Sequence, residues 1–339
     1  MGLGDTVSGY RGRGSTDQRV WLRLRDAAEA AGSPISPHNP AVQRFLASLD
    51  ELERPQIAAI HRWLHANVLT GTYRESLYDV GTTLETGDFN CLTAALLFKV
   101  ACERSGISVR FVATAEHVSC RASDGTWIEP TCADWFGVGF GEAIGVRSRN
   151  ESAAFCGIGW QGLLARVCYN RGVARLAAGD FPAAASDFAL ASRRDPAFRE
   201  AFENQLAALN NGALACCAER NFPEAIARLQ AARTLDPTSR LVQANALHID
   251  HQWSMWLCES GSYGEALALL EAGRDRQPQA ALYRYGPPAI ARQWLEALSR
   301  QQPSLQNSRI RAELTARYPD AAAAAVSGRA TWDRSGQDQ

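Results

Sequence analysis

Three residues of complementary chemistry, Cys91, His117 and Glu129, occur in an order that suits nucleophilic catalysis. A cysteine nucleophile needs a thiolate, a base within hydrogen-bonding reach and a third group that orients the base. Cys91 falls at the first turn of a predicted helix, where unpaired N–H groups and the helix dipole favour a thiolate and can receive an oxyanion. His117 opens a predicted strand, and Glu129 lies near the end of the next strand. The sequence therefore predicts a Cys–His–Glu triad that attacks an amide or ester carbonyl.

A predicted β-hairpin would bring the histidine to the acid. Its loop, Ser123-Asp124-Gly125, has the composition of a three-residue turn that Gly closes in the left-handed conformation. Such a loop pairs Ala122 with Thr126, and this register places His117 and Glu129 on one face as diagonal neighbours. The opposite face is then mostly apolar, whereas a two-residue loop would mix polar and apolar residues on both faces. Burial and chemistry thus favour the same register.

The elements that must position these residues indicate an α+β first half. The apolar spacing predicts helices over 17–31, 39–52, 55–69 and 90–104. Asn90 is the expected N-cap of the last of these helices, and Gly106 lies just past its end. Short β patterns follow over 108–115, 117–122 and 126–130.

The second half of the chain is helical, Ala-rich and repetitive. A small–large–small–Pro pattern occurs three times at a constant interval, as Ala184, Phe188, Ala191 and Pro196, then Ala225, Leu229, Ala232 and Pro237, then Ala266, Leu270, Gly273 and Pro278. This spacing is typical of a tetratricopeptide repeat, in which small residues let two helices approach and Pro ends the second. The interval exceeds the usual ~34 residues, so we expect long connections between the helix pairs.

Three short motifs in the first half carry a family resemblance. The stretch from Gly87 to Phe98, the run Ala115-Glu116-His117-Val118 and the run Trp127-Ile128-Glu129-Pro130-Thr131 together resemble the transglutaminase-like branch of the papain-like cysteine superfamily. With the repeats behind them, they resemble in particular a bacterial group that joins such a domain to C-terminal tetratricopeptide repeats. The resemblance implies a triad of Cys91, His117 and Glu129, although the family's acid is commonly Asp. It does not assign the oxyanion-hole side chain, for which Asn90, Glu85 and Tyr78 are candidates.

The resemblance and the patterns together predict four segments. We expect a disordered start over 1–16, a transglutaminase-like domain with N-terminal helices over 17–157, a tetratricopeptide array over 163–318 and a flexible tail over 319–339. The implied function is cysteine-dependent acyl transfer, either amide hydrolysis as in a peptidase or transfer to an amine, with the repeats recruiting a protein or peptide partner. The alternative is a non-catalytic adaptor whose transglutaminase-like domain is degenerate.

Composition narrows the remaining classes. The net charge is −1, without Lys/Arg-rich runs, so we expect neither nucleic acid nor a membrane as partner. Nine Cys without a framework spacing indicate a reducing compartment, hence a cytoplasmic protein. We expect no cofactor and no metal: a zinc site would need Cys120 and Cys132, which the favoured register turns away from His117. His61 and His65 stand four residues apart without an HExxH glutamate, and we expect solvated or core histidines.

Overall fold

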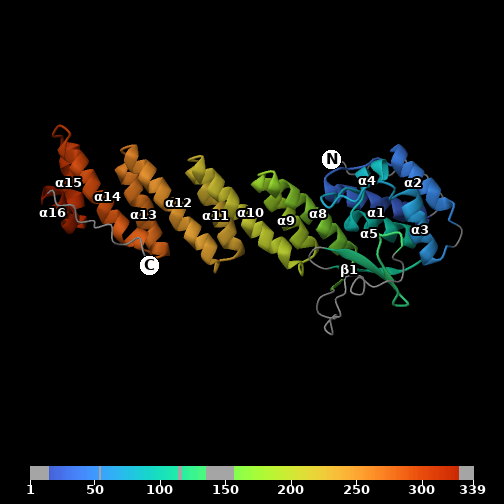
Figure 1. Ribbon diagram of the computed structural model, residues 1–339. Helices are drawn as coiled ribbons and strands as arrows, with labels where there is room; N and C mark the ends of the chain where they lie inside the picture. Colours follow the sequence, from blue (N-terminus) through green and yellow to red (C-terminus); the bar gives the residue numbers. More distant parts are fainter. Residues whose placement is uncertain (1–14, 53–54, 114–116, 135–155, 328–339) are drawn as a thin grey trace. The chain divides into compact units, whose positions relative to one another are not determined.

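The computed structural model describes residues 15–52, 55–113, 117–134 and 156–327. The chain is mostly helical with one small antiparallel sheet, which is an α+β composition, and it divides into two compact units, Met1–Ala208 and Leu209–Gln339 (Figure 1). Residues 1–14 of the expected disordered start, residues 135–155 of the first expected domain and residues 328–339 of the expected tail lie outside the described residues.

The first unit is built around one central helix. Its helices are α1 (Ser15–Ala31), α2 (Pro40–Asp50), α3 (Ile57–Asn67), α4 (Val80–Thr86), α5 (Cys91–Arg104), α8 (Trp160–Ala177), α9 (Phe181–Arg194) and the first part of α10 (Arg199–Ala218). Helix α5 is buried along almost its whole length, because its sequence is apolar on every face. Helices α1, α3, α4 and α8 pack against α5, and so do two strands of the sheet. The helix that begins at Cys91 is therefore held from several sides.

The sheet of the first unit has four antiparallel strands in the order β3-β2-β1-β4. They are β1 (Val109–Ala113), β2 (Val118–Ala122), β3 (Trp127–Ile128) and β4 (Cys156–Ile158). In the β2–β3 hairpin Cys120 pairs with Ile128 and Arg121 with Trp127. Gly125 closes the loop at φ 93°. The three-residue loop and the register predicted from the sequence are confirmed.

Three elements differ from the sequence expectations. The connection before Cys91 contains helix α4, which Asp79 caps by accepting a hydrogen bond from the Gly81 N–H at 2.9 Å. Strand β4 pairs with β1, far away in sequence, so no local pattern announced it. Residues 319–327, which their composition placed in the flexible tail, form helix α16 (Pro319–Ser327), because Ala has the highest helix propensity.

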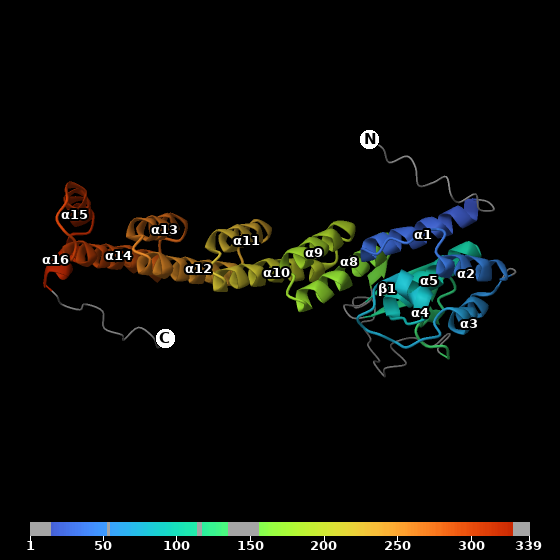
Figure 2. The same cartoon turned by 90° about the horizontal axis from the view of Figure 1, so that it is seen from above.

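The second unit is a succession of antiparallel helices. After the last part of α10 come α11 (Phe222–Leu235), α12 (Arg240–Glu259), α13 (Tyr263–Arg276), α14 (Ala281–Ser299), α15 (Leu305–Arg317) and α16. Figure 2 shows α12 and α14 following one another in a row, with α11, α13 and α15 along one side of it. The repeated small residues are the buried contact positions of α11 and α13. A Cβ on Gly273 would lie only 2.1 Å from the Tyr283 ring, so Gly is required there.

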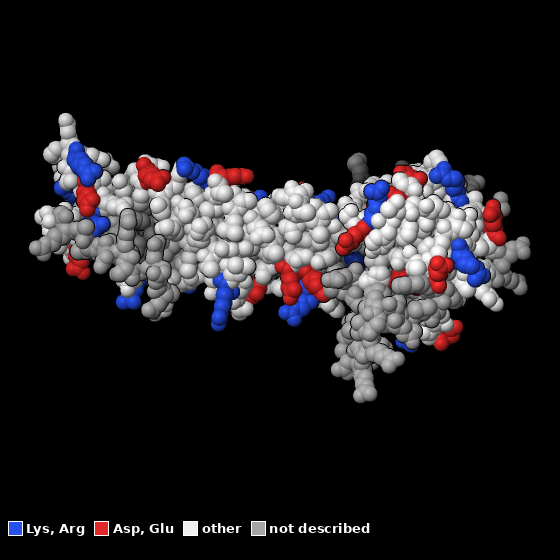
Figure 3. Space-filling view, viewed as in Figure 1, with Lys and Arg blue, Asp and Glu red and all other residues white. Residues whose placement is uncertain are grey.

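Two surface properties bear on function. On the face shown in Figure 3, basic and acidic side chains are interspersed, and no broad patch of one sign forms there. Within the described ranges, no helix has both the length and the apolar character that a membrane span requires.

Candidate active site

The N-terminus of α5 presents Cys91. Asn90 forms a reciprocal capping box with Thr93: its side-chain oxygen accepts from the Thr93 N–H at 2.9 Å, and the Thr93 hydroxyl accepts from the Asn90 N–H at 3.1 Å. The Asn90 amide also donates to the main-chain oxygen of Glu75 at 3.2 Å. The cap anticipated from the sequence is confirmed, and it fixes the first helical turn on which Cys91, 8% exposed, is carried.

The β2–β3 hairpin brings His117 to Glu129. His117 immediately precedes β2, and Glu129 immediately follows β3. The two side chains meet with 2.6 Å between His117 Nε2 and Glu129 Oε2, a short contact suited to a charge-assisted hydrogen bond. Both side chains are largely buried, so little water competes with the bond.

The second oxygen of the Glu129 carboxylate is also held. Oε1 accepts from the Thr131 hydroxyl at 2.5 Å and from the Thr131 main-chain N–H at 3.2 Å. Because Thr131 occupies one oxygen, the other is fixed in direction toward the imidazole of His117. The Glu129-Pro130-Thr131 end of the third sequence motif thus supplies both the acid and the residue that anchors it.

The imidazole of His117 also interacts with the thiol of Cys91. Burial lowers the pKa of His117, but hydrogen bonds with Cys91 and with Glu129, together with the nearby carboxylate charge, more than offset it and raise the pKa to about 10. Because Nε2 is engaged by Glu129, we infer that Nδ1 serves the thiol. At neutral pH the site therefore favours an imidazolium between a sulfur and a carboxylate.

Tyr73 also lies at the site, and no sequence motif pointed to it. Burial, and then the adjacent Cys91 thiol, raise the pKa of Tyr73 to about 12, so the phenol keeps its proton at neutral pH. The backbone N–H of Cys91 also faces the phenol oxygen. The Tyr73 ring packs edge-on against Phe89, with 6.0 Å between centroids. A phenol thus stands at the place where a helix-start N–H and the sulfur meet.

The loop that carries Tyr73 is tied to the strand-like segment before Cys91. Main-chain bonds join Arg74 N to Phe89 O at 2.8 Å and Phe89 N to Thr72 O at 3.2 Å. Asp88 accepts from the Thr72 N–H and forms an ion pair with Arg74. These bonds fix the position of Tyr73 relative to Cys91.

Two glycines allow that close approach, and they were the one local signal for it. A Cβ on Gly71 would lie 2.7 Å from the main chain of Gly87, and Gly87 itself adopts φ 77°. From the sequence alone such glycines indicate only a loop, because the segments that they bring together, 71–74 and 87–89, are separated along the chain.

The other residues weighed from the sequence have other partners. Glu85 accepts from the Asn39 amide at 3.0 Å, and Tyr78 packs against the core of the first unit. Cys120 is fully buried on the apolar face of the hairpin. Within the described residues, the His, Cys, Asp and Glu side chains form no group arranged to hold a metal ion.

The chain matches no known family model and no curated protein.

Proposed function

We propose that the transglutaminase-like domain expected over 17–157 is a cysteine enzyme that transfers acyl groups through Cys91, His117 and Glu129. The main support is the 2.6 Å contact between His117 Nε2 and Glu129 Oε2. The same imidazole also interacts with the thiol of Cys91. A nucleophile, a base and an orienting acid in that order define the general arrangement for covalent acyl transfer. The motifs quoted from the sequence, with their resemblance to transglutaminase-like proteins, point the same way.

In the proposed reaction the thiol proton of Cys91 passes to His117, and the sulfur attacks the carbonyl carbon of an amide or ester. The tetrahedral oxyanion is received by N–H groups at the start of α5, with the Tyr73 hydroxyl as a further donor. His117 Nδ1–H gives its proton to the leaving amine or alkoxide, and Glu129 stabilises the imidazolium before that transfer. An acyl-thioester on Cys91 remains. Water, deprotonated by the now neutral His117, completes hydrolysis, whereas an amine completes transfer.

Intact-mass spectrometry tests this proposal. The protein is incubated with p-nitrophenyl acetate and with glutamine- or ester-containing peptides, and the adduct is mapped. We expect a single acyl adduct on Cys91, removed by hydroxylamine and lost in Cys91→Ala. Cys91→Ser is the matched control, because it keeps the size of the side chain but not the thiol. An adduct that persists in Cys91→Ala, or that spreads over the other cysteines, contradicts the proposal.

The helical repeats over 163–318, proposed to be a tetratricopeptide array, would recruit the protein or peptide partner. A hollow of about 560 Å³ lies between α12 and α14 and is lined by Met255, Leu282, Tyr285 and Ile290, with Glu259 at its margin. Met255 and Tyr285 are 47% and 50% exposed, and such exposed apolar side chains in a concavity are typical of binding surfaces.

The same hollow favours a second candidate function, a non-catalytic adaptor. In that case the helical array is the binding surface, and the transglutaminase-like domain is degenerate. The discriminating experiment is selection of a binding peptide from a display library with the full chain, followed by the variants Tyr285→Lys and Cys91→Ala. An adaptor loses binding only in Tyr285→Lys and shows no acyl adduct in any variant.

A further inference from the structure

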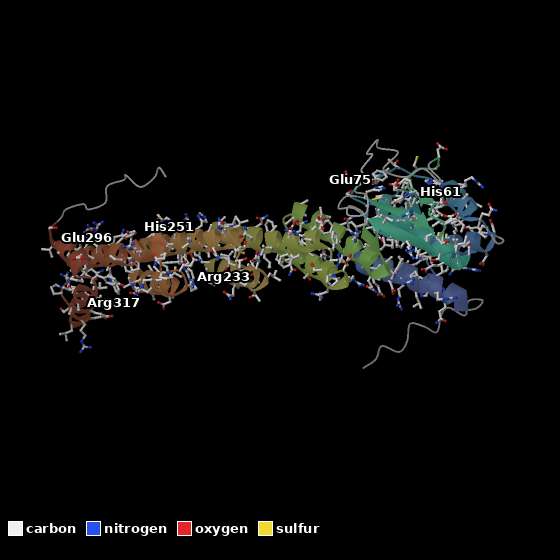
Figure 4. All side chains as sticks on the ribbon, turned by 90° about the horizontal axis from the view of Figure 1, so that it is seen from below. His61, Glu75, Arg233, His251, Glu296 and Arg317 are labelled. Atoms are coloured by element: carbon white, nitrogen blue, oxygen red, sulfur yellow. The ribbon has the colours of Figure 1, made fainter. Side chains whose placement is uncertain are left out.

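One of the two histidines of α3 is bound to the candidate catalytic acid. His61, which is labelled in Figure 4, is fully buried in the first unit. Its Nε2 lies 3.0 Å from the main-chain oxygen of Glu129. A carbonyl oxygen only accepts, so the ring donates Nε2–H. Burial lowers the pKa of His61, and the neutral ring therefore carries its proton on the nitrogen that faces Glu129.

The ring of His61 is held in place by aromatic neighbours. Phe98 of α5 meets it edge-on at 6.1 Å between centroids, and His65 meets it at 4.9 Å. His65 in turn packs edge-on against Phe89, two residues before Cys91, and the main-chain oxygen of Pro130 faces it. Helix α3 thus touches both the segment before the nucleophile and the segment that carries the acid.

The main chain at Glu129 needs such support. The last β2–β3 pair of the ladder is Cys120 with Ile128, so Glu129 is the first residue beyond the strand. Its oxygen is shared between His61 and the Cys132 N–H, the latter at 3.3 Å. The contact from His61 is the shorter of the two, and it comes from a different layer of the unit.

We propose that His61 is a positioning residue for the Cys91–His117–Glu129 site, because its Nε2–H holds the Glu129 carbonyl and so fixes the carboxylate against His117. This inference rests on the proposed function for its effect on catalysis, but the geometric effect on His117 exists whether or not turnover occurs. His61 does not touch the thiol, and it acts through Glu129.

The test compares three variants of the full chain. His61→Leu removes the donor and retains bulk, His61→Gln keeps an N–H donor on a side chain of similar reach, and Ile60→Val is a matched control in the buried face of the same helix. Two quantities are measured in each: the midpoint of the His117 titration by NMR, and the rate at which iodoacetamide labels Cys91. Circular dichroism establishes that each variant is folded.

We expect His61→Leu to slow labelling of Cys91 about fivefold and to lower the His117 midpoint by about 0.7 pH unit, the equivalent of one ordinary hydrogen bond. His61→Gln should recover most of both effects, and Ile60→Val should change neither. Equal effects of His61→Leu and Ile60→Val, or the absence of recovery in His61→Gln, overturn the positioning role. If the wild type itself shows no preferential labelling of Cys91 while His61→Leu still lowers the His117 midpoint, the proposed function fails and the positioning role stands.

Discussion

Replacement of Glu129 by Gln isolates the charge that the site places beside His117. The two side chains have the same shape, and the Gln oxygen can still accept from the Thr131 hydroxyl as Oε1 does at 2.5 Å. The amide then turns its NH₂ toward His117 Nε2, which loses both its acceptor and the neighbouring negative charge. The change therefore removes the carboxylate's effect on the imidazolium with little change in packing.

The magnitude follows from the contact of 2.6 Å between His117 Nε2 and Glu129 Oε2. A hydrogen bond to a charged group contributes about 1.5–3 kcal/mol. One pKa unit corresponds to about 1.4 kcal/mol, so Glu129→Gln should lower the pKa of His117 by about one to two units from its value of about 10. Loss of the same stabilisation from the imidazolium beside Cys91 should slow alkylation of this cysteine about tenfold or more at pH 7.

The assay records the His117 ring resonances as a function of pH, together with the second-order rate of iodoacetamide labelling at Cys91. Asp124→Asn is the matched control: Asp124 lies in the loop of the same hairpin, is exposed, and accepts from the Thr126 N–H at 2.9 Å, which Asn can also do. The control should leave both quantities unchanged.

If Cys91 is labelled at the wild-type rate in Glu129→Gln, and His117 titrates at the wild-type pH, the Glu129 carboxylate does not stabilise the imidazolium. The carboxylate would then be a structural ligand of Thr131 with no hold on the imidazole.

Three further predictions concern stability. The pKa of His117 is about 10 in the folded protein against an ordinary 6.5, so its contribution is full below about pH 6.5 and is lost as the pH rises toward 10; at about 1.4 kcal/mol per pKa unit, urea titrations should show a fall of up to about 5 kcal/mol across that window that is absent in His117→Asn. Arg220 adopts φ 61° at the turn where the flanking helix pairs have Gly179 and Gly261 at φ 79° and 80°, so Arg220→Gly should stabilise the chain by about 1 kcal/mol in thermal melts, whereas an Arg220→Ala variant that gains as much would contradict this explanation. A Cβ on Gly172 would lie 2.8 Å from the Phe188 ring, so Gly172→Ala should destabilise by about 1–3 kcal/mol, and an unchanged melting curve would contradict the contact.

The sequence predicted the parts of the site that depend on local spacing. The Asn90 cap and the 123–125 loop follow from short-range rules, and with the register of the hairpin they place His117 beside Glu129. The burial of small residues in α11 and α13 followed from their repetition at a constant interval. In each of these cases the partner lies within a few turns or one tight loop.

The rest of the site depends on contacts between distant segments. Tyr73 reaches Cys91 because a loop pairs with the segment before α5, and only the glycines at that crossing hint at it. His61 was assigned to solvent or core, and it is in the core; its bond to the Glu129 carbonyl could not be foreseen, because it joins residues 68 apart. Strand β4 could not be predicted either, because its pairing partner β1 is distant in the sequence. The resemblance to transglutaminase-like proteins, and the activity it implies, remain predictions.

In the proposed site one imidazole, that of His117, activates one thiol among nine. The most direct measurement labels the folded protein with limiting iodoacetamide and determines the rate at every cysteine by peptide mass spectrometry, in the wild type and in His117→Ala. We predict that Cys91 is labelled well ahead of the half-buried Cys132 and Cys258 despite its lower exposure, and that this lead disappears in His117→Ala. Rates that simply follow exposure, unchanged by loss of His117, would contradict the account.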